Sequence, residues 1–494
     1  MVTIYKEGNE KSPVSIEACE GENLLDLLKK TGFFVDAPCG GHGSCGKCKV
    51  TVNGRESLAC QTTVSGDLEV RLPVKEQTAI LTDTLWTDTV MEPLQEGYLL
   101  AFDIGTTTIA GYLLDEQGNT LSAASMLNPQ ETFGADVISR IQAAKKGYLK
   151  ELTRLLRDAL MSLTGELCEK SGVRPGDAGV VSLVGNPAMQ QFFLGIPVDN
   201  LASPPFAPVL TEAKWVPARD FLPECARAKL LLIPDISGYV GADTVGCVLS
   251  TRMYTEDKMT LLVDIGTNGE MVLGNKEKMI ACSTAAGPAL EGARICLGMR
   301  GAPGAVDHVR YSDGKLLVHV IGEQEAVGIC GSGLVDAVAV LLEAGWINQR
   351  GRIQKHCPCY EEPGEERIVR LTKDVYLTQN DIREVQMAKG AIAAGVALMA
   401  EQLGISLEEI DQVFLAGAFG SFMDAHSACR IGLLPAVLEA KIQAVGNAAG
   451  SGAKIAAMNR REWERTAELT QKIRFLELAE LPDFQHVFAR NMSL

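Results

Sequence analysis

The chain has 494 residues, of which 46% are hydrophobic and 22% are charged. These fractions are those of an ordinary globular protein, and the length suggests about three compact units. The formal net charge of -16 argues against a nucleic acid partner, because phosphate backbones attract basic surfaces and the sequence has no basic cluster. We interpret the acidity as a solubility feature, with a docking face for a redox partner as the less favoured alternative.

The N-terminus shows no basic segment followed by an apolar one, as a signal peptide would. The most apolar helical stretch, residues 391–400, is much shorter than the ~20 residues that span a bilayer. We therefore expect a cytoplasmic protein without a membrane partner. In a reducing compartment its fourteen cysteines favour metal ligands and buried thiols over disulfides.

The order of elements over residues 1–74 is that of an α+β, β-grasp, ferredoxin-like domain. Strand-like runs over residues 2–5 and 14–17 predict a hairpin. A short helix is predicted over residues 22–30, because acids stand in its first turn and lysines in its last. Residues 75–97 contain five threonines and no clear period, which indicates a linker.

A cysteine loop follows this helix, with the spacing C-x5-C-x2-C-x11-C at Cys39, Cys45, Cys48 and Cys60. Four thiolates are what a [2Fe–2S] cluster requires, and the glycines between them leave room for a loop to wrap it. The first gap is one residue longer than the plant-type spacing. Zinc is the main competitor, but zinc sites usually show two C-x2-C pairs and this loop has one. We expect the iron–sulfur cluster.

The other ten cysteines show no second cluster. Most stand among apolar or small residues and are expected to be buried thiols; these are Cys168, Cys225, Cys247, Cys282, Cys296, Cys330 and Cys429. Cys357 and Cys359 flank a proline and follow a histidine. A reduced surface loop is the favoured interpretation of that pair, and a metal site is the alternative.

From residue 98 onward strands and helices alternate, which predicts an α/β domain over residues 98–494. Leucines at helical spacing over residues 149–167 predict one buried helix face. An apolar strand with an Asp-Ile-Gly-Thr turn occurs twice, at Asp103 and at Asp264, 161 residues apart. The repeat predicts two similar lobes that face a shared cleft.

The paired turns have the chemistry of a phosphate site. Glycine allows a tight turn whose N–H groups point at phosphate oxygens, and threonine hydroxyls add hydrogen bonds. Asp103 and Asp264 are the candidate catalytic residues, since each could hold Mg²⁺ through water or orient an attacking water. The candidate phosphate residues are Gly105, Thr106, Thr107, Thr108, Gly266, Thr267, Asn268 and Gly269.

A third glycine loop follows the apolar strand at residues 413–416, and no P-loop motif is present. Together with the two turns it resembles the superfamily of actin, hexokinase and the sugar and acetate kinases. The resemblance implies an ATP site in which Gly417, Ala418 and Gly420 approach the adenosine. Gly331, Ser332 and Gly333 resemble the second connecting segment of that superfamily, with a plain small-residue helix contact as an equal alternative.

A ferredoxin-like loop joined to such a module resembles the reductive activators of corrinoid-dependent methyltransferases. The resemblance extends through residues 127–130, 134–140, 184–189, 238–243 and 285–292. It implies that ATP and Mg²⁺ drive the transfer of one electron from the [2Fe–2S] cluster to a corrinoid protein, returning inactive Co(II) to Co(I). A low-potential electron donor is a further implied partner. The segment 75–97 is too short for the middle domain of longer members, which leaves homodimer formation open.

Three alternatives remain at this stage. The first is a phosphotransferase with a redox-sensing cluster, in which Asp235 or Asp243 would be the base. The second is an activator of radical dehydratases, although those hold their cluster on the ATPase module between two subunits. The third is a scaffold without enzymatic activity.

Overall fold

The computed structural model describes the chain except residues 7–8, 32, 34, 36–47, 73–88, 313–314 and 365, and it leaves out the side chains of residues 6, 9–12, 29–30, 418–419 and 421. Cys39 and Cys45 therefore lie outside the described residues, as does most of the predicted linker. In the described parts, no helix is both long and apolar enough to cross a membrane.

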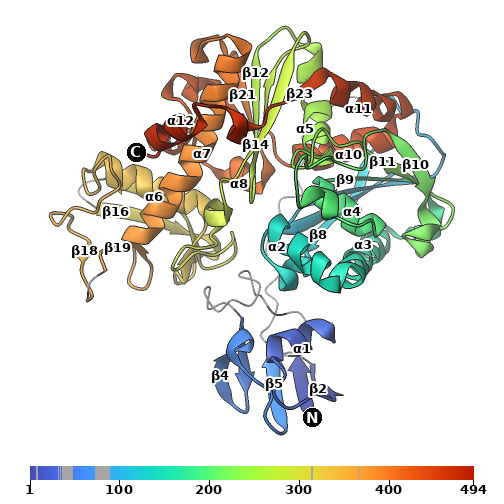
Figure 1. Ribbon diagram of the computed structural model, residues 1–494, viewed down its shortest axis with the longest axis horizontal. Helices are drawn as coiled ribbons and strands as arrows, with labels where there is room; N and C mark the ends of the chain where they lie inside the picture. The colour runs from blue at the N-terminus through green and yellow to red at the C-terminus, as the bar shows by residue number, and fades with distance from the viewer. Residues whose placement is uncertain are drawn as a thin grey trace.

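The first domain is a five-stranded sheet with one helix and forms a separate unit at one end of the molecule (Figure 1). Its strands, in the order β2-β1-β5-β3-β4, are β1 (Val2–Lys6), β2 (Asn9–Ile16), β3 (Lys49–Val52), β4 (Arg55–Leu58) and β5 (Leu68–Leu72). The predicted hairpin is confirmed as the antiparallel pair β1–β2, and the predicted helix as α1 (Leu24–Lys30). Alternate residues of β5 are buried, so one face of this sheet and α1 share a core.

The first lobe of the larger domain is a six-stranded sheet in the order β10-β11-β9-β6-β7-β8. Its strands are β6 (Tyr98–Ile104), β7 (Thr108–Leu114), β8 (Thr120–Leu127), β9 (Ala178–Gly185), β10 (Lys214–Pro217) and β11 (Lys229–Leu232). Its helices are α2 (Val137–Ala143), α3 (Leu149–Ser171) and α4 (Pro187–Leu194). The predicted leucine face is the buried face of α3, which packs on β7 and β8.

The second lobe repeats this arrangement around the order β22-β21-β12-β13-β14-β23. Its strands are β12 (Thr260–Ile265), β13 (Gly269–Gly274), β14 (Met279–Thr284), β21 (Gln412–Ala416), β22 (Ile442–Ala444) and β23 (Ile473–Phe475). In each lobe a three-stranded antiparallel meander is extended by a strand parallel to its first member, β9 beside β6 and β21 beside β12. The duplication predicted from the repeated turns is confirmed.

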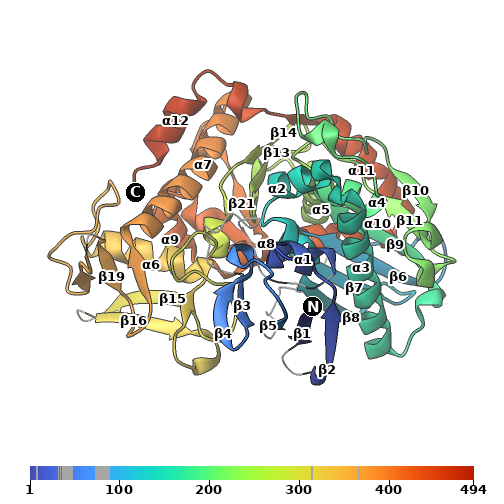
Figure 2. The ribbon, with the colours of Figure 1, turned by 60° about the horizontal axis from the view of Figure 1, so that its bottom comes forward.

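Further strands and helices complete the second lobe. They are β15 (Ala305–Ser312), β16 (Lys315–Val320), β17 (Gly328–Ile329), α6 (Gly331–Glu343), β18 (Tyr360–Glu361), β19 (Ile368–Arg370), β20 (Tyr376–Thr378), α7 (Gln379–Leu403), α8 (Gly417–Phe422), α9 (Ala425–Arg430) and α12 (Phe484–Asn491). The long helix α7 packs on β13 and β14, and α6 packs on β15. Figure 2 shows the two lobes beside each other, with the first domain in front.

Two helices between the lobes, α5 (Ala242–Thr251) and α10 (Ala448–Met458), make the connection, and α11 (Arg460–Lys472) follows them. A Cβ on Gly452 would lie 2.2 Å from the carbonyl oxygen of Gly246, so α5 and α10 touch backbone to backbone. Residues 331–333 begin α6, which packs on β15 within the second lobe, and their resemblance to the second connecting segment stays a prediction.

The end of the predicted linker belongs to the larger domain. Glu92 N donates to Met458 O at 2.9 Å, and Asn459 Nδ2 donates to Val90 O at 2.9 Å. Met91 and Leu94 pack against the core that the two lobes share. Residues 89–97 are thus fixed to α10 and its C-terminal end, and the linker prediction concerns only the part that is not described.

Candidate functional site

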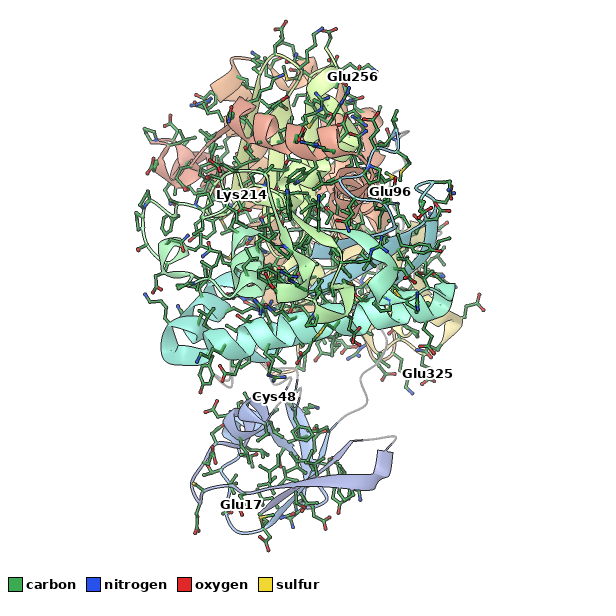
Figure 3. The ribbon with its side chains drawn as sticks, turned by 90° about the vertical axis from the view of Figure 1, so that its right-hand side faces the viewer. Glu17, Cys48, Glu96, Lys214, Glu256 and Glu325 are labelled. Carbon is green, nitrogen blue, oxygen red and sulfur yellow. The ribbon has the colours of Figure 1, made fainter. Side chains whose placement is uncertain are left out.

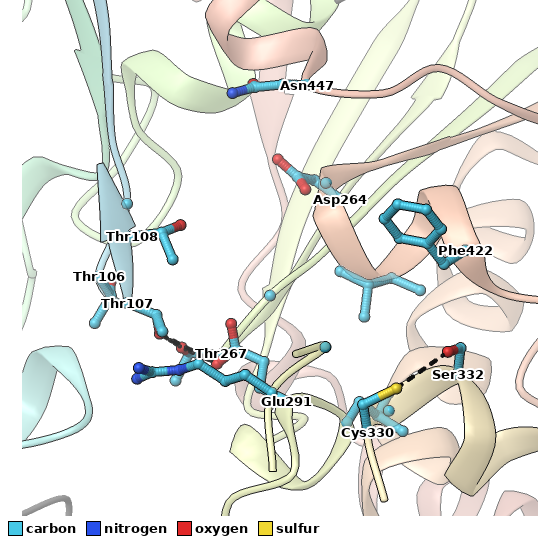
Figure 4. A pocket seen from close by; sticks show the side chains of 18 of the residues that line it. Thr106, Thr107, Thr108, Asp264, Thr267, Glu291, Cys330, Ser332, Phe422 and Asn447 are labelled. Carbon is cyan, nitrogen blue, oxygen red and sulfur yellow. Dashed lines mark hydrogen bonds between the residues drawn. The ribbon is translucent and has the colours of Figure 1, made fainter. Parts of the chain in front are cut away.

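The two Asp-Ile-Gly-Thr turns meet at the junction of the lobes. Thr107 Oγ1 and Thr267 Oγ1, 160 positions apart in the chain, lie 3.3 Å from each other. Glu291 Oε2 accepts from both hydroxyls, at 3.3 Å from Thr107 and 2.7 Å from Thr267 (Figure 4). Because each turn joins the first two strands of its own meander, the duplicated fold brings the two turns into direct contact.

A cleft of about 570 Å³ opens around these turns. Twelve of the predicted site residues line it: Asp103, Gly105, Thr106, Thr107, Thr108, Asp264, Gly266, Thr267, Asn268, Gly331, Ser332 and Gly417. Phe422 of α8 and Ser332 lie on one side of the cleft and Thr106 and Thr107 on the other (Figure 4). The structure thus gathers residues from four distant parts of the sequence around one cavity.

Three other predicted glycines have packing roles. A Cβ on Gly269 would lie 2.8 Å from Thr284 Oγ1, and one on Gly333 would lie 2.3 Å from Val306 O, where α6 meets β15. A Cβ on Gly420 would lie 3.2 Å from Leu415 Cβ. The side chain of Ala418 is not described. Of the segment 331–333, the first two residues line the cleft and the third makes the small-residue helix contact.

The glycines of the cleft itself leave room for a ligand. A Cβ on Gly266 would meet no atom within 4 Å, so the space beside this turn is open. Gly417 has φ +83°, and its Cβ would lie 2.7 Å from Asp264 Oδ1. A side chain at Gly417 would be strained and would also press on a candidate catalytic carboxylate. The cleft fits a phosphate chain that lies close to backbone.

Acidic side chains gather on the cleft wall at Asp103, Asp243, Asp264, Glu270 and Glu291. Burial and the charge of Asp264 raise the pKa of Asp103 to about 7, against the effect of a hydrogen bond from Asn447. Burial raises the pKa of Asp243 to about 7 and that of Asp264 to about 6. These carboxylates repel one another in a poorly solvated site, an arrangement that a bound cation would relieve.

No described group of three His, Cys, Asp or Glu side chains is close enough to hold a metal ion by itself. Mg²⁺ usually keeps several waters and binds through one or two carboxylates plus substrate phosphates. The chemistry of this wall therefore fits Mg²⁺ that arrives with a nucleotide better than a permanent metal centre.

We predict that the ligand-free protein loses stability as the pH rises from about 4 to 7. Asp103, Asp243 and Asp264 have pKa values above the ordinary aspartate value, so in this window the folded state binds more protons than the unfolded one. The loss is at most about 1.4 kcal/mol per carboxyl and pH unit. Thermal unfolding in chelator at several pH values measures it. A stability that rises over this window would contradict the assignment, and Asp264→Asn should flatten the slope.

Three asparagines that the sequence analysis did not assign hold the turns in place. Asn128 Nδ2 donates to Gly105 O at 2.9 Å, and Asn186 Nδ2 donates to Thr106 Oγ1 at 3.0 Å. Asn447 Nδ2 donates to Asp103 Oδ2 at 2.9 Å and to Tyr112 Oη at 3.1 Å. Asn186 and Asn447 also cap α4 and α10, so each links a helix start to the cleft.

One of the two carboxylates proposed as a kinase base, Asp235, lies outside the cleft lining. Asp235 is 3% exposed and accepts from Gln190 Nε2 at 2.7 Å and from Ala242 N at 3.1 Å. It therefore fixes the start of α5 and does not face the cavity. Asp243 of the same segment does line the cleft.

Cys48 and Cys60, two of the four predicted cluster ligands, are neighbours in the first domain. Their Sγ atoms lie 3.2 Å apart, longer than a disulfide bond, so the two cysteines are not joined by a disulfide. The bond from Ala59 N to Cys48 O, 2.8 Å, extends the β3–β4 pairing to these residues, and Asn23 Nδ2 donates to Cys60 O at 2.9 Å. Cys48 is labelled in Figure 3, on the side of its domain that faces the lobes. Two thiols held this close fit one iron of a cluster.

One expectation for the remaining cysteines is wrong and another holds in part. Cys296 is exposed, with its Sγ 3.8 Å from Tyr376 Oη, where a buried thiol was expected. Cys357 and Cys359 are reduced thiols, as predicted, in a segment whose His356 and Pro358 are exposed, but Cys357 belongs to the core of the second lobe and Cys359 is partly buried. Burial raises the pKa of the Cys357 thiol to about 11, which favours an inert side chain.

Comparison with family models covers nearly the whole chain. The 2Fe-2S iron-sulfur cluster binding domain matches residues 8–65, the RACo middle region matches 98–256, and the C-terminal domain of RACo, the ASKHA domain, matches 258–494. A region that bears the name of the middle region is therefore present as residues 98–256, which form the first lobe and α5. The prediction that the chain lacks a middle domain is therefore wrong, because the model of the RACo middle region matches residues 98–256.

Two individual relatives and one solved structure agree with the family models. The corrinoid activation enzyme RamQ of Eubacterium limosum is 31% identical over 575 residues, covering 96% of this chain and 97% of the relative. A [Co(II) methylated amine-specific corrinoid protein] reductase of Methanosarcina barkeri is 29% identical over 54% of this chain and 51% of its own length. The solved structure of a reductive activator for corrinoid, iron-sulfur protein covers all of this chain and 98% of its own, with a TM-score of 0.76 at 28% identity.

Proposed function

Because this chain belongs to the RACo-type family of corrinoid activators, we propose that it reduces the Co(II) form of a corrinoid protein to Co(I) in a reaction that depends on ATP and Mg²⁺. The observation that carries the proposal is the union, in one chain, of a ferredoxin-like domain and a cleft in which two phosphate-binding turns touch. The names of the relatives supply the substrate class.

In this reaction ATP offsets the free-energy cost of an unfavourable electron transfer. Plant-type [2Fe–2S] clusters have potentials near -400 mV, and each 100 mV of shortfall costs about 2.3 kcal/mol per electron. ATP can offset such a cost only if it binds two states of the activator, or of its complex with the corrinoid protein, with different affinities. We propose that closure of the lobes on Mg-ATP is this change of state.

The residues of the cleft have separable roles in the proposal. The turns at Gly105 and Gly266 offer backbone N–H groups to the phosphates, and the carboxylates of Asp103 and Asp264 would hold Mg²⁺, which would neutralise part of the phosphate charge. Asn447 keeps Asp103 oriented by its 2.9 Å hydrogen bond. Gly417 admits the nucleoside end beside Asp264.

The cluster, when bound by Cys39, Cys45, Cys48 and Cys60, supplies a one-electron carrier. Cys48 and Cys60 are fixed by the β3–β4 pairing, so half of the ligand set is pre-arranged.

An anaerobic assay tests the function. The protein is mixed with a Co(II) corrinoid protein, a low-potential reductant and Mg-ATP, and Co(I) is followed by its visible spectrum. We expect Co(I) to accumulate with ATP and not with ADP. Co(I) that forms equally fast without nucleotide would overturn the proposal, and ATP turnover that increases with a small polyol would support the phosphotransferase alternative.

A further inference from the structure

One guanidinium stands in a cleft wall that is otherwise mainly acidic. Six carboxylates line the cavity, and among the lining residues the basic side chains are Arg300 and His319. His319 Nδ1 is already bonded to Asp307 Oδ1 at 2.5 Å. A nucleoside triphosphate brings several negative charges into this wall, and Mg²⁺ neutralises only part of them. Arg300 is thus the permanently charged cationic side chain among these lining residues.

Arg300 is bound across the lobes. Its Nη2 lies 2.6 Å from Oε1 of Glu131, which follows β8 in the first lobe, whereas Arg300 follows β14 in the second. The side chain of Arg300 is 27% exposed and that of Glu131 6%. The pair therefore joins the same two lobes as the contact between Thr107 and Thr267, and Arg300 lines the same cavity.

The position of Arg300 along the cleft follows from a chain of contacts. Gly417, in the glycine loop, lies against Asp264. The turn after Asp264 contains Thr267, whose Oγ1 donates a hydrogen bond to Glu291. Arg300 acts electrostatically on Glu291. Phe422 and the glycine loop lie on the opposite side of the cleft from the turn threonines (Figure 4). If the adenine base of ATP lies beside Phe422, the phosphate farthest from the adenine lies at the threonines, Glu291 and Arg300.

Glu131 has a second cation behind it. Arg140 of α2 is fully buried, its Nε donates to Gly134 O at 2.9 Å, and its charge acts on Glu131. Glu131 Oε2 and Arg140 Nη2 are buried without a hydrogen-bond partner among the described residues. Because Arg140 stays on the lobe of Glu131, the carboxylate would keep a counter-charge if Arg300 left it. The cost of breaking the inter-lobe pair is lowered accordingly.

We propose that Arg300 binds the terminal phosphate of ATP and that Glu131 competes with this phosphate for the guanidinium. Binding of ATP then exchanges an ion pair between the lobes for a contact between Arg300 and the nucleotide. ADP lacks the terminal phosphate and leaves the pair intact. The inference rests on the proposed function in that it requires nucleotide to bind this cleft, and it adds the residue pair that distinguishes ATP from ADP.

Titration calorimetry of ATP and ADP with the full chain tests the pair through effects of opposite sign. Arg300→Gln should weaken ATP binding about tenfold or more, as for loss of a hydrogen bond between charged groups, and should change ADP binding much less. Glu131→Gln should tighten ATP binding by about twofold to fivefold, because a partly exposed ion pair no longer competes. The control is Glu462→Gln, which breaks the 2.9 Å pair with Arg252, also 27% exposed, outside the cleft lining. It should change neither affinity.

Two results would overturn the inference. One is an unchanged ratio of ATP to ADP affinity in Arg300→Gln; the other is a Glu131→Gln protein that folds and binds ATP more weakly. Either result would mean that the ion pair between Arg300 and Glu131 only holds the two lobes together and does not respond to ATP. A wild-type protein that binds neither nucleotide would instead overturn the proposed function together with this inference, so the two failures are distinguishable.

Discussion

Replacing Asp264 with asparagine is expected to lower ATP hydrolysis, and with it ATP-dependent Co(I) formation, by about 10²-fold or more. The substitution keeps the size of the side chain beside Gly417 but removes the negative charge that would hold Mg²⁺. The same change should leave the ligand-free protein as stable as before or more stable, because the negative charge of Asp264 raises the pKa of Asp103 and opposes its ionisation. Phosphate release measures the first effect and thermal unfolding the second.

A second buried aspartate of the same lobe provides the control. Asp336 of α6 accepts from His308 Nδ1 at 2.9 Å, its side chain is 5% exposed, and it lies outside the cleft lining. Asp336→Asn should reduce stability, since it weakens a buried charge-assisted bond, and should leave hydrolysis within a few-fold of wild type. If Asp264→Asn retained full hydrolysis, or if the two variants behaved alike, the catalytic assignment of Asp264 would be wrong.

The features that the sequence predicted are those that depend on local chain geometry. The repeat at Asp103 and Asp264 predicted two similar lobes because a strand, a glycine turn and a return strand form the same hairpin wherever they occur. The leucines of α3 predicted a buried face because their spacing alone defines one side of a helix. Such patterns need no knowledge of what packs against them.

The contacts between the lobes could not be predicted in this way. Glu291, Asn447 and Arg300 act on residues more than a hundred positions away or in the opposite lobe, and none stands in a recognisable spacing with its partner. The stretches 127–130, 134–140, 184–189, 238–243 and 285–292 had no mechanism at the level of sequence. In the structure they supply Asn128, Arg140, Asn186, Asp243 and Glu291, which line the cleft or support it.

The surroundings of residues 331–333 and of Cys357 could not be predicted from the sequence for a related reason. Small residues at a helix start are compatible both with a ligand and with close packing, and Gly333 packs on Val306 whereas Ser332 faces the cleft. A Cys-Pro-Cys run with a preceding histidine has the composition of an exposed loop, yet the fold of the second lobe buries Cys357. Composition does not specify which side of a chain segment a neighbouring helix will cover.

Replacing Cys48 with serine is expected to remove the visible absorption of the cluster and to abolish Co(II) reduction, while ATP hydrolysis stays within about threefold of wild type. The physical reason is that a hydroxyl is a much poorer ligand for iron than a thiolate, whereas none of the described residues that line the nucleotide cleft belongs to the first domain. Cys60→Ser should behave alike, because the two sulfurs lie 3.2 Å apart and fit the same iron. Iron content and the reduced-state electron paramagnetic resonance signal report the cluster directly.

Cys19→Ser is the matched control for this loss. Cys19 is an exposed thiol of the same domain that precedes α1 and lies outside the cysteine loop, so its replacement should leave iron, spectrum and activity unchanged. Electron transfer that survives in Cys48→Ser with full iron content would mean that the cluster has other ligands. A parallel loss of ATP hydrolysis in Cys48→Ser, with the protein still folded, would mean that the first domain takes part in the nucleotide cycle and that the two functions are coupled before the corrinoid protein binds.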